Sequence, residues 1–129
     1  MAIYKFDTFL FEMANLHKTD SKLPANVYFT CNGDVRITKH NALRVKIQGD
    51  KGERVNPDRL FPLVFHTTDN YDEIVDVKLT GKALKASDLS KSEIDQIVSY
   101  VEQNWEIVVK HWCGELTDKQ LLQLLPSYS

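Results

Sequence analysis

The segment from Ser90 to Trp112 most constrains the fold, because its apolar residues recur at the spacing of an α-helix. At about 100° per residue they fall within an arc of roughly 120°, the width of a stripe that faces a core. The stripe consists of Ile94, Ile97, Val98, Val101, Trp105, Val108, Val109 and Trp112. Ser90 and Glu93 form a capping-box pattern at the start, and Gly114 is suited to end the helix. We expect one long amphipathic helix with this stripe buried.

The overall composition is that of a globular protein. A chain of 129 residues with 43% hydrophobic and 26% charged residues is typical of one soluble domain, which we expect to span residues 1–129. The sequence shows neither a signal peptide nor an apolar run near the roughly 20 residues that cross a bilayer. Two cysteines, Cys31 and Cys113, are too few for a disulfide framework. We expect a cytoplasmic protein without membrane contact.

A β-hairpin is predicted over residues 26–38, because β-branched and aromatic residues flank Asn32 and Gly33, the strongest short-range hairpin signal. A loop longer than these two residues keeps the apolar side chains on one face. In that register Phe29 pairs with Ile37.

Two further segments alternate as half-buried strands do. In the first, Leu43, Val45 and Ile47 alternate with Arg44, Lys46 and Gln48; in the second, Val75, Val77 and Leu79 alternate with Asp76, Lys78 and Thr80. Between them, Asn56-Pro57-Asp58 predicts a single helical turn. The apolar run 60–66 contains Pro62, so it is an edge strand, a bulge, or a strand that begins after the proline.

The two ends of the chain predict short helices. Near the N-terminus, helical spacing relates Phe6, Phe9, Leu10, Met13 and Leu16, with a strand through Ile3, Phe9 and Phe11 as the alternative. Near the C-terminus, Thr117 and Gln120 form a second capping-box pattern. Strands that precede a long helix indicate an α+β fold: a small antiparallel sheet with one long amphipathic helix packed on it, plus short N- and C-terminal helices.

No set of side chains in the sequence predicts catalysis or metal binding. The histidines, His17, His40, His66 and His111, lie far apart, and no paired His or Cys spacing of a zinc site occurs. Cys113 would lie at a helix C-terminus, where the dipole disfavours a thiolate. A solvated turn explains the carboxylates Asp69, Asp72, Glu73 and Asp76 better than a general acid–base pair. We expect no catalytic residues, no metal and no cofactor.

One candidate binding surface is a basic patch. Residues 36–59 contain seven basic and three acidic residues, although the whole chain has a net charge of −2. The patch would comprise Arg36, Lys39, His40, Arg44 and Lys46. It could meet phosphates or an acidic protein. The alternative is that these side chains only solvate the outer face of the sheet.

The other candidate surface lies on the back of the long helix, on a face with few charges. It consists of Gln96, Tyr100, Gln103, Ile107 and His111. Either a terminal helix of the same chain covers this face or a partner subunit does. Asp95, Glu102 and Glu106 form an acidic edge beside it that could complement a basic patch, and Glu106 with Lys110 is an i, i+4 pair.

The segments KHNALRVKIQG and VSYVEQNWEIVVKHW together resemble a small prokaryotic family of unknown function, with a His-Asn-Pro-Pro-His-x-His strand motif and a later helix ending in tryptophan. The resemblance spans residues 36–112: His40 and Asn41 match the motif, and Trp112 the terminal tryptophan. Residues 42–46 replace Pro-Pro-His-x-His, so no role of the family histidines is carried over. Members often look like one half of paired bacterial or phage loci of the toxin–antitoxin type, which implies a binding role.

We expect a non-enzymatic cytosolic protein-interaction module, with a phage, a mobile element or a toxin–antitoxin-like pair as its source. Its partner would be another protein or a second copy of the chain. The first alternative is a nucleic-acid-binding protein that uses the basic patch, with affinity that falls steeply with salt. The second alternative is a small hydrolase or nuclease whose catalytic residues come together from distant loops.

Overall fold

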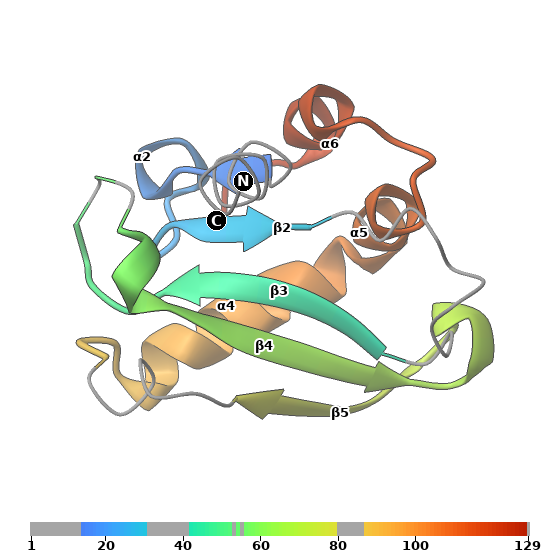
Figure 1. Cartoon of the computed structure of the whole chain (residues 1–129), viewed down its shortest axis with the longest axis horizontal. Coiled ribbons are helices and arrows are strands. Elements are labelled where there is room, and N and C mark those ends of the chain that lie inside the picture. Colours follow the sequence, from blue (N-terminus) through green and yellow to red (C-terminus); the bar gives the residue numbers. More distant parts are fainter. Residues whose placement is uncertain (1–13, 31–41, 53, 55, 80–86, 129) are drawn as a thin grey trace, which may run out of the picture.

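The computed structural model describes residues 14–30, 42–52, 54, 56–79 and 87–128. Within these residues, antiparallel strands form one five-stranded sheet in the order β1-β2-β3-β4-β5 (Figure 1). The strands are β1 (Ala14–Leu16), β2 (Val27–Phe29), β3 (Ala42–Gln48), β4 (Leu60–Thr67) and β5 (Ile74–Leu79). Strands adjacent in the chain are therefore adjacent in the sheet, and the predicted α+β class is confirmed.

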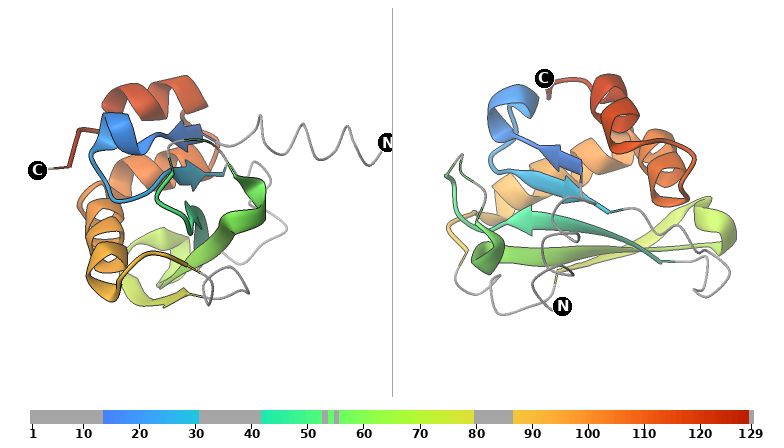
Figure 2. Two further views of the ribbon diagram at one scale, coloured as in Figure 1. Left: turned by 90° about the vertical axis from the view of Figure 1, so that its left-hand side faces the viewer. Right: turned by 45° about the horizontal axis from the view of Figure 1, so that its top comes forward.

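The described helices follow the strands, apart from one short helix between β1 and β2. They are α2 (Lys18–Ser21), α4 (Lys91–Gln103), α5 (Trp105–Trp112) and α6 (Asp118–Leu124), with 3-10 turns η1 (Pro57–Arg59) and η2 (Asp69–Tyr71). α4 crosses behind the sheet in Figure 1, and the left view of Figure 2 shows it on one side of the strands. α6 contacts both α5 and β1, so the closing helix lies beside the first strand.

The core lies between α4 and one face of the sheet. The alternate residues Leu43, Val45 and Ile47 of β3 and Phe61, Leu63 and Phe65 of β4 are at most 1% exposed. Ile97 and Val101 of α4 are fully buried in the same cluster. Burying a side chain of this size contributes about 1.5–3 kcal/mol. The alternation predicted for β3 is confirmed, except that Gln48 is also fully buried.

The single long helix predicted over 90–112 is wrong, because the chain leaves helical geometry at Asn104. This residue has φ −112° and ψ 25°, and it separates α4 from α5. Its side-chain amide Nδ2 donates to the Tyr100 carbonyl at 2.9 Å, while its own N–H is shared between the carbonyls of Tyr100 and Val101. Asparagine competes in this way with the helical ladder. The apolar stripe nevertheless stays buried or half-buried on both sides of the break.

The predicted helix ends are confirmed. Ser90 Oγ accepts from the Glu93 N–H at 3.1 Å and Glu93 Oε1 accepts from the Ser90 N–H at 2.9 Å. Thr117 and Gln120 form the same reciprocal pair at the start of α6. Gly114 has φ 84°, a left-handed conformation that glycine adopts without a steric penalty, just after α5 ends.

The neighbours of β2 differ from the predicted hairpin. Phe29 pairs with Ala14 on one side and with Val45 on the other. Because both edges of β2 are occupied at this residue, the predicted pairing of Phe29 with Ile37 is wrong. The turn residues Asn32 and Gly33 lie outside the described residues.

The N-terminal helix prediction is wrong at its last residue, because Leu16 belongs to β1. The other residues of that prediction, and those of the alternative strand, lie outside the described part of the chain. They are Ile3, Phe6, Phe9, Leu10, Phe11 and Met13.

Strand β4 runs through Pro62 instead of beginning after it. Pro62 lies opposite Lys46 of β3, whereas the described pairs with β5 begin at Leu63. Within these pairs the proline has a neighbouring strand on one side only, which is where a residue without an N–H is tolerated. Asn56 caps η1 as predicted, with its side chain accepting from the Asp58 N–H at 3.3 Å.

A β-bulge alters the predicted alternation of β5. His66 pairs with Asp76 and Thr67 with Ile74, which leaves Val75 without a partner in β4. Ile74 therefore joins Val77 against the core, and Val75 is 69% exposed. A bulge redirects the side chains of an edge strand in this way.

Candidate binding edge at strand β5

The structure describes only part of the predicted basic patch. Arg36, Lys39 and His40 lie outside the described residues. Arg44 is exposed on β3, and Lys46 is half-buried. Burial lowers the pKa of Lys46, and the charge of Arg44 lowers it further. The two side chains share the outer face of the sheet, away from α4.

The predicted interface on the back of the helix is wrong for Tyr100 and His111, because the same chain buries both. The Tyr100 hydroxyl donates to the Pro126 carbonyl, and its ring lies 6.4 Å from that of Tyr128. Burial raises the pKa of Tyr100 to about 12. His111 Nε2 lies 2.6 Å from Asp118 Oδ1 on α6. The closing helix and the tail after it thus provide the cover.

The rest of that helix face does not form a continuous surface. Gln96 is half-buried and Gln103 is exposed. Ile107 is partly buried and packs against the core. These side chains remain accessible in part, but Tyr100 and His111, which would have connected them, face inward.

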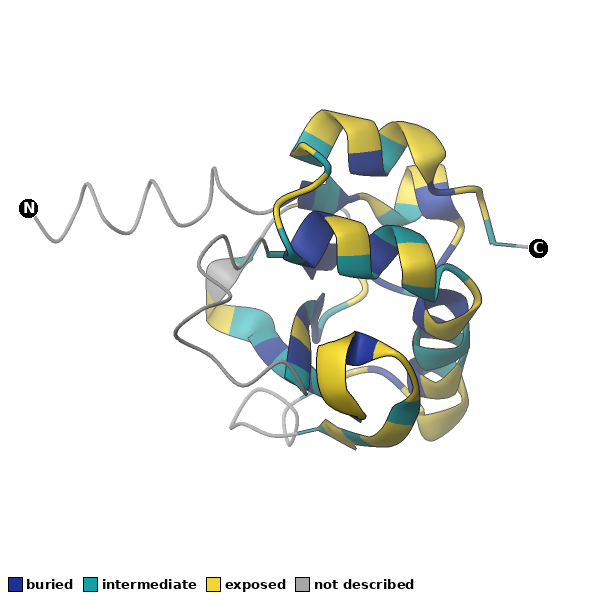
Figure 3. Cartoon of the chain, turned by 90° about the vertical axis from the view of Figure 1, so that its right-hand side faces the viewer, coloured by how far each residue is buried: buried dark blue, intermediate teal, exposed yellow. Residues whose placement is uncertain are grey.

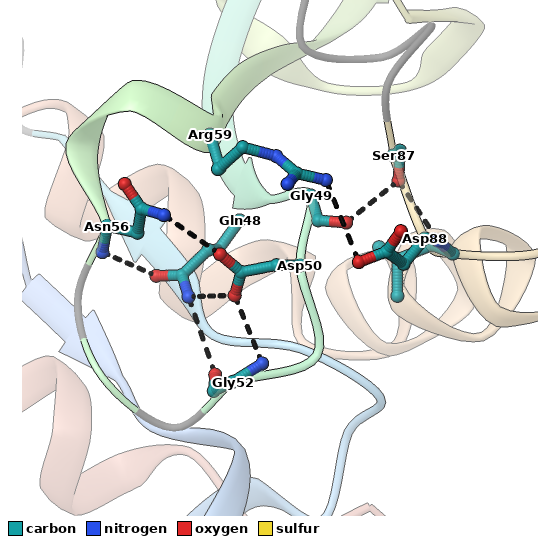
Figure 4. Close-up of polar contacts among 9 residues, drawn as sticks. Gln48, Gly49, Asp50, Gly52, Asn56, Arg59, Ser87 and Asp88 are labelled. Carbon is teal, nitrogen blue, oxygen red and sulfur yellow. Dashed lines mark hydrogen bonds and ion pairs between the residues drawn. The ribbon is translucent and has the colours of Figure 1, made fainter.

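A buried polar network that the sequence did not predict surrounds Gln48 at the end of β3 (Figure 4). Gln48 Oε1 accepts from the Tyr28 hydroxyl at 2.7 Å and from the Asn56 N–H at 3.1 Å. Gln48 Nε2 donates to Asp50 Oδ1 at 2.6 Å and to the Arg54 carbonyl at 2.9 Å. We call these residues the Gln48 network. Both ends of the buried amide are satisfied inside the protein, as buried polar groups require.

Asp50 extends this network toward the loop. Its carboxylate accepts from the Gly52 N–H at 3.0 Å and from Asn56 Nδ2 at 3.1 Å. Desolvation raises the pKa of Asp50, but the hydrogen bonds from Gln48, Gly52 and Asn56 and the charge of Arg59 outweigh it and lower the pKa below its usual value. A carboxylate that accepts several hydrogen bonds stays ionised and stabilises the loop. It is a poor general acid or base at neutral pH.

The same loop is joined to the segment that leads into α4. The Gly49 carbonyl accepts from the Ser87 hydroxyl at 3.2 Å and from the Asp88 N–H at 2.8 Å. Arg59 forms an ion pair with Asp88 at 3.7 Å (Figure 4). The polar groups of this loop therefore bind other parts of the same chain. We assign the loop a structural role.

Strand β5 presents the opposite situation at the edge of the sheet, at the bottom of Figure 1. Among the described residues, β4 is its only hydrogen-bonded neighbour. Within the described residues, no strand pairs with the outer backbone groups of β5, which is the usual property of a sheet edge. Val75, at the start of this edge, is one of the few large apolar side chains that are mainly exposed.

An open groove of about 570 Å³ lies between β5 and the junction of α4 with α5. Its lining consists of Glu73, Ile74, Val75, Asp76, Val77, Glu102 and Trp105. We call it the β5 groove. The break at Asn104 lies between Glu102 and Trp105, so the start of α5 forms part of the wall. The lining combines four apolar or aromatic side chains with three carboxylates.

Trp105 is fixed in the β5 groove by contacts on two sides. Its Nε1 donates to the Tyr71 carbonyl at 2.8 Å, and its ring centroid lies 5.4 Å from that of Phe65. Tyr71 also accepts, through its hydroxyl, from Trp112 Nε1 at 3.0 Å. Figure 3 shows η2, which contains Tyr71, below α5 on this side of the molecule. The apolar wall is therefore pre-formed.

The charged side chains of the β5 groove are all acidic. Glu73, Asp76 and Glu102 form what we call the acidic rim. No ion pair joins any of them to another side chain in the described part of the chain. In contrast, Glu106 is paired with Lys110 at 3.6 Å, as predicted. The sequence identified these carboxylates separately, as a solvated turn and a helix edge, but not their convergence.

Comparison of the chain with models of protein families, with curated proteins and with solved structures gives no match. The resemblance around His40 and Asn41 therefore stays a prediction. Among the described residues, no group of three or more His, Cys, Asp or Glu side chains is arranged to hold a metal ion. Nor does any described helix have the length and apolar character needed to cross a membrane.

Proposed function

We propose that this protein is a non-enzymatic interaction module that binds an extended segment of another protein as an additional strand at β5. The observation that carries the proposal is the outer edge of β5, which no described strand pairs with, beside a pre-formed groove that contains Trp105. In strand addition, main-chain hydrogen bonds supply affinity and pockets for alternate side chains supply specificity. The edge of β5 offers the main-chain hydrogen bonds, and the β5 groove offers a pocket for side chains.

The geometry of β5 defines the binding segment further. Asp76 to Leu79 form the regular part of the edge, because the bulge at Val75 interrupts the ladder. A segment paired with these residues would place every second side chain on the helix side of the sheet, toward Trp105. The intervening side chains would lie beside Asp76 and Lys78. We place this binding activity in the cytoplasm. A role in a toxin–antitoxin-like pair would rest only on the resemblance to the small prokaryotic family.

The experiment is a selection of random peptides of about ten residues, the length of a strand with short flanks, on the immobilised protein. Amide spectra of the ¹⁵N-labelled protein then locate the bound peptides. We expect the shifts to concentrate at residues 74–79 and near Trp105. In an added strand, only every second peptide amide faces β5. N-methylation of that set should abolish binding, because a methylated amide cannot donate to β5, whereas N-methylation of the other set should not.

The outcome that contradicts the proposal is equally clear. Selected peptides that leave the β5 signals unchanged would show that another surface binds. Peptides that bind equally well with either set of amides methylated would show that no ladder forms.

A second candidate function is nucleic-acid binding on the outer face of the sheet. Arg44 and Lys78 lie on either side of Val64, in one row across three strands, and Lys46 lies two residues from Arg44. Binding to phosphates should weaken steeply with salt. Mobility-shift titrations at several salt concentrations test this function, with the double variant Arg44→Glu and Lys78→Glu. Retardation that is unchanged in this variant would rule the surface out.

A further inference from the structure

We infer that the segment bound at β5 is cationic, with a basic and an apolar residue on the side that it turns to the helices and a basic residue opposite Asp76, and that it does not come from a second copy of this chain. The inference rests on the proposed strand addition and specifies its ligand. It follows from the charges around the β5 groove and from the two faces that an added strand would present.

The acidic rim is available to a cationic ligand. Glu102 and Asp76 are exposed, as is Glu73. None of the three has an ion-pair partner among the described side chains. A bound lysine or arginine would therefore gain a new contact without breaking an ion pair of the described part of the chain. Each such contact at a partly exposed site changes affinity by roughly two- to fivefold.

On the helix side, an added strand would present its side chains to Trp105, Val77 and Glu102. An arginine here can lay its methylene groups and guanidinium plane against the indole and direct its charge toward the Glu102 carboxylate. Valine or isoleucine at the neighbouring helix-side position suits contact with Ile74 and Val77. This face therefore selects an arginine beside an apolar residue.

On the outer side, the strand would lie beside Asp76 and Lys78. Directly opposed charges of opposite sign stabilise a strand pair, and like charges destabilise it. A basic residue is thus expected opposite Asp76, and a neutral or acidic residue opposite Lys78. The charges on β5 also discourage association with unrelated sheet edges.

A second copy of the chain fits this surface poorly. An antiparallel pair of β5 strands centred on Val77 would place Asp76 opposite Lys78 of the other copy on the outer face, which is favourable. Such a pair forms one continuous sheet with both helix layers on the same side. The helix-side residues of the second β5 would be Val77 and Leu79, so that strand would bring no cation to Glu73 and Glu102 of the first copy.

The test uses calorimetric titration of the full chain with three synthetic peptides of equal length that carry arginine, glutamine or glutamate at two positions, one facing Glu102 and one opposite Asp76. In all three, valine occupies the neighbouring helix-side position and threonine the position opposite Lys78. We expect the arginine peptide to bind roughly four- to 25-fold more tightly than the glutamine peptide, because two carboxylates of the rim are engaged. The glutamate peptide should not bind. Affinity for the arginine peptide should fall as NaCl rises from about 0.05 to 0.3 M, where exposed charges are increasingly screened.

The double variant Glu73→Gln and Glu102→Gln should reduce the preference for arginine to the part contributed by Asp76 while leaving binding of the glutamine peptide unchanged. Glu115→Gln, an exposed carboxylate outside the groove lining, is the matched control and should change nothing. Far-UV circular dichroism verifies that each variant is folded. Sedimentation equilibrium should show a monomer at the concentrations used.

The possible failures differ. If the glutamine and arginine peptides bind equally and shift the β5 amide signals, the proposal of strand addition is supported and the inferred preference for a cationic segment is wrong. If no peptide shifts the β5 amides, both are wrong. A concentration-dependent dimer with altered β5 amides would overturn the exclusion of a second copy.

Discussion

At the end of β3 the buried amide of Gln48 makes hydrogen bonds at both its oxygen and its nitrogen, whereas at the edge of the sheet Glu73, Asp76 and Glu102 have no ion-pair partner among the described side chains. Both regions are rich in polar groups, and both lie at the margin of the same sheet. They differ in whether the chain itself supplies the partners.

This difference separates a structural role from a binding role. Polar groups that are buried and mutually satisfied rigidify the fold, and losing one partner is costly because the others are left unpaired. Exposed charges without partners add little to folding stability and remain available to a ligand. Substitutions at Gln48 should therefore act on stability, and substitutions in the acidic rim on binding.

The largest effect on stability is expected for Gln48→Leu. The substitution keeps the volume but leaves the Tyr28 hydroxyl and the Arg54 carbonyl without this partner, at a cost of about 3 kcal/mol in unfolding free energy. Urea unfolding followed by far-UV circular dichroism measures it. Gln103→Leu, at an exposed glutamine on α4, is the control and should stay within about 0.5 kcal/mol of the wild type. Equal effects of the two substitutions would show that the buried Gln48 amide contributes no more to stability than an exposed glutamine does.

Trp105→Ala tests the residue that belongs to the core and to the β5 groove at once. Because Trp105 is only half-buried, we expect a loss of about 2 kcal/mol, below the 3–5 kcal/mol typical of fully buried tryptophan. Peptide binding at β5 should be lost as well. Urea unfolding and calorimetric titration provide the two measurements, and retained binding would show that the groove is not used.

Asp50 allows the Gln48 network to be tested with pH. Its pKa is lower in the folded protein than its usual value, so its stabilising contribution is complete above that usual value. The contribution is lost as pH falls through the folded-state pKa. Asp50→Asn should cost about 1 kcal/mol at pH 7 and should show a smaller loss of stability than the wild type on acidification. Parallel acid dependence of the two proteins would mean that Asp50 is not held by the network.

The smallest effect on stability is expected for the double variant Glu73→Gln and Glu102→Gln. Neither carboxylate has an ion-pair partner to lose in the described part of the chain, so the free energy of unfolding should change by less than about 0.5 kcal/mol. Thermal unfolding measures this change. A loss of more than 1 kcal/mol would place these carboxylates among the structural groups.

The features that the sequence predicted correctly depend on neighbours within a few residues. The capping boxes at Ser90 and Thr117 need only the residue three positions later, and the alternation of β3 is read along one strand. The i, i+4 pair of Glu106 and Lys110 has the same local origin. Short-range chemistry is therefore sufficient for such elements.

The features that the sequence did not predict depend on contacts between distant segments. Gln48 belongs to the polar residues that alternate along β3, so the pattern predicts that it is exposed. Its burial is favourable only because the loop that includes Asn56 supplies hydrogen-bond partners. The break at Asn104 lies within an apolar pattern that continues on both sides. The acidic rim combines residues from β5, the turn before it and α4, which converge only after the sheet and the helices pack.

Tyr71 has a practical consequence for measurement. Its carbonyl and its hydroxyl bind the indole N–H groups of Trp105 and Trp112, and these are the two tryptophans of the chain. All indole emission of the protein therefore comes from two side chains bound to Tyr71, of which Trp105 lines the β5 groove. A ligand that excludes water from half-buried Trp105 would shift that emission to shorter wavelength, whereas Trp112, 8% exposed, would contribute a nearly constant background. The protein thus carries its own optical reporter, and occupation of the edge can be followed without attaching a dye.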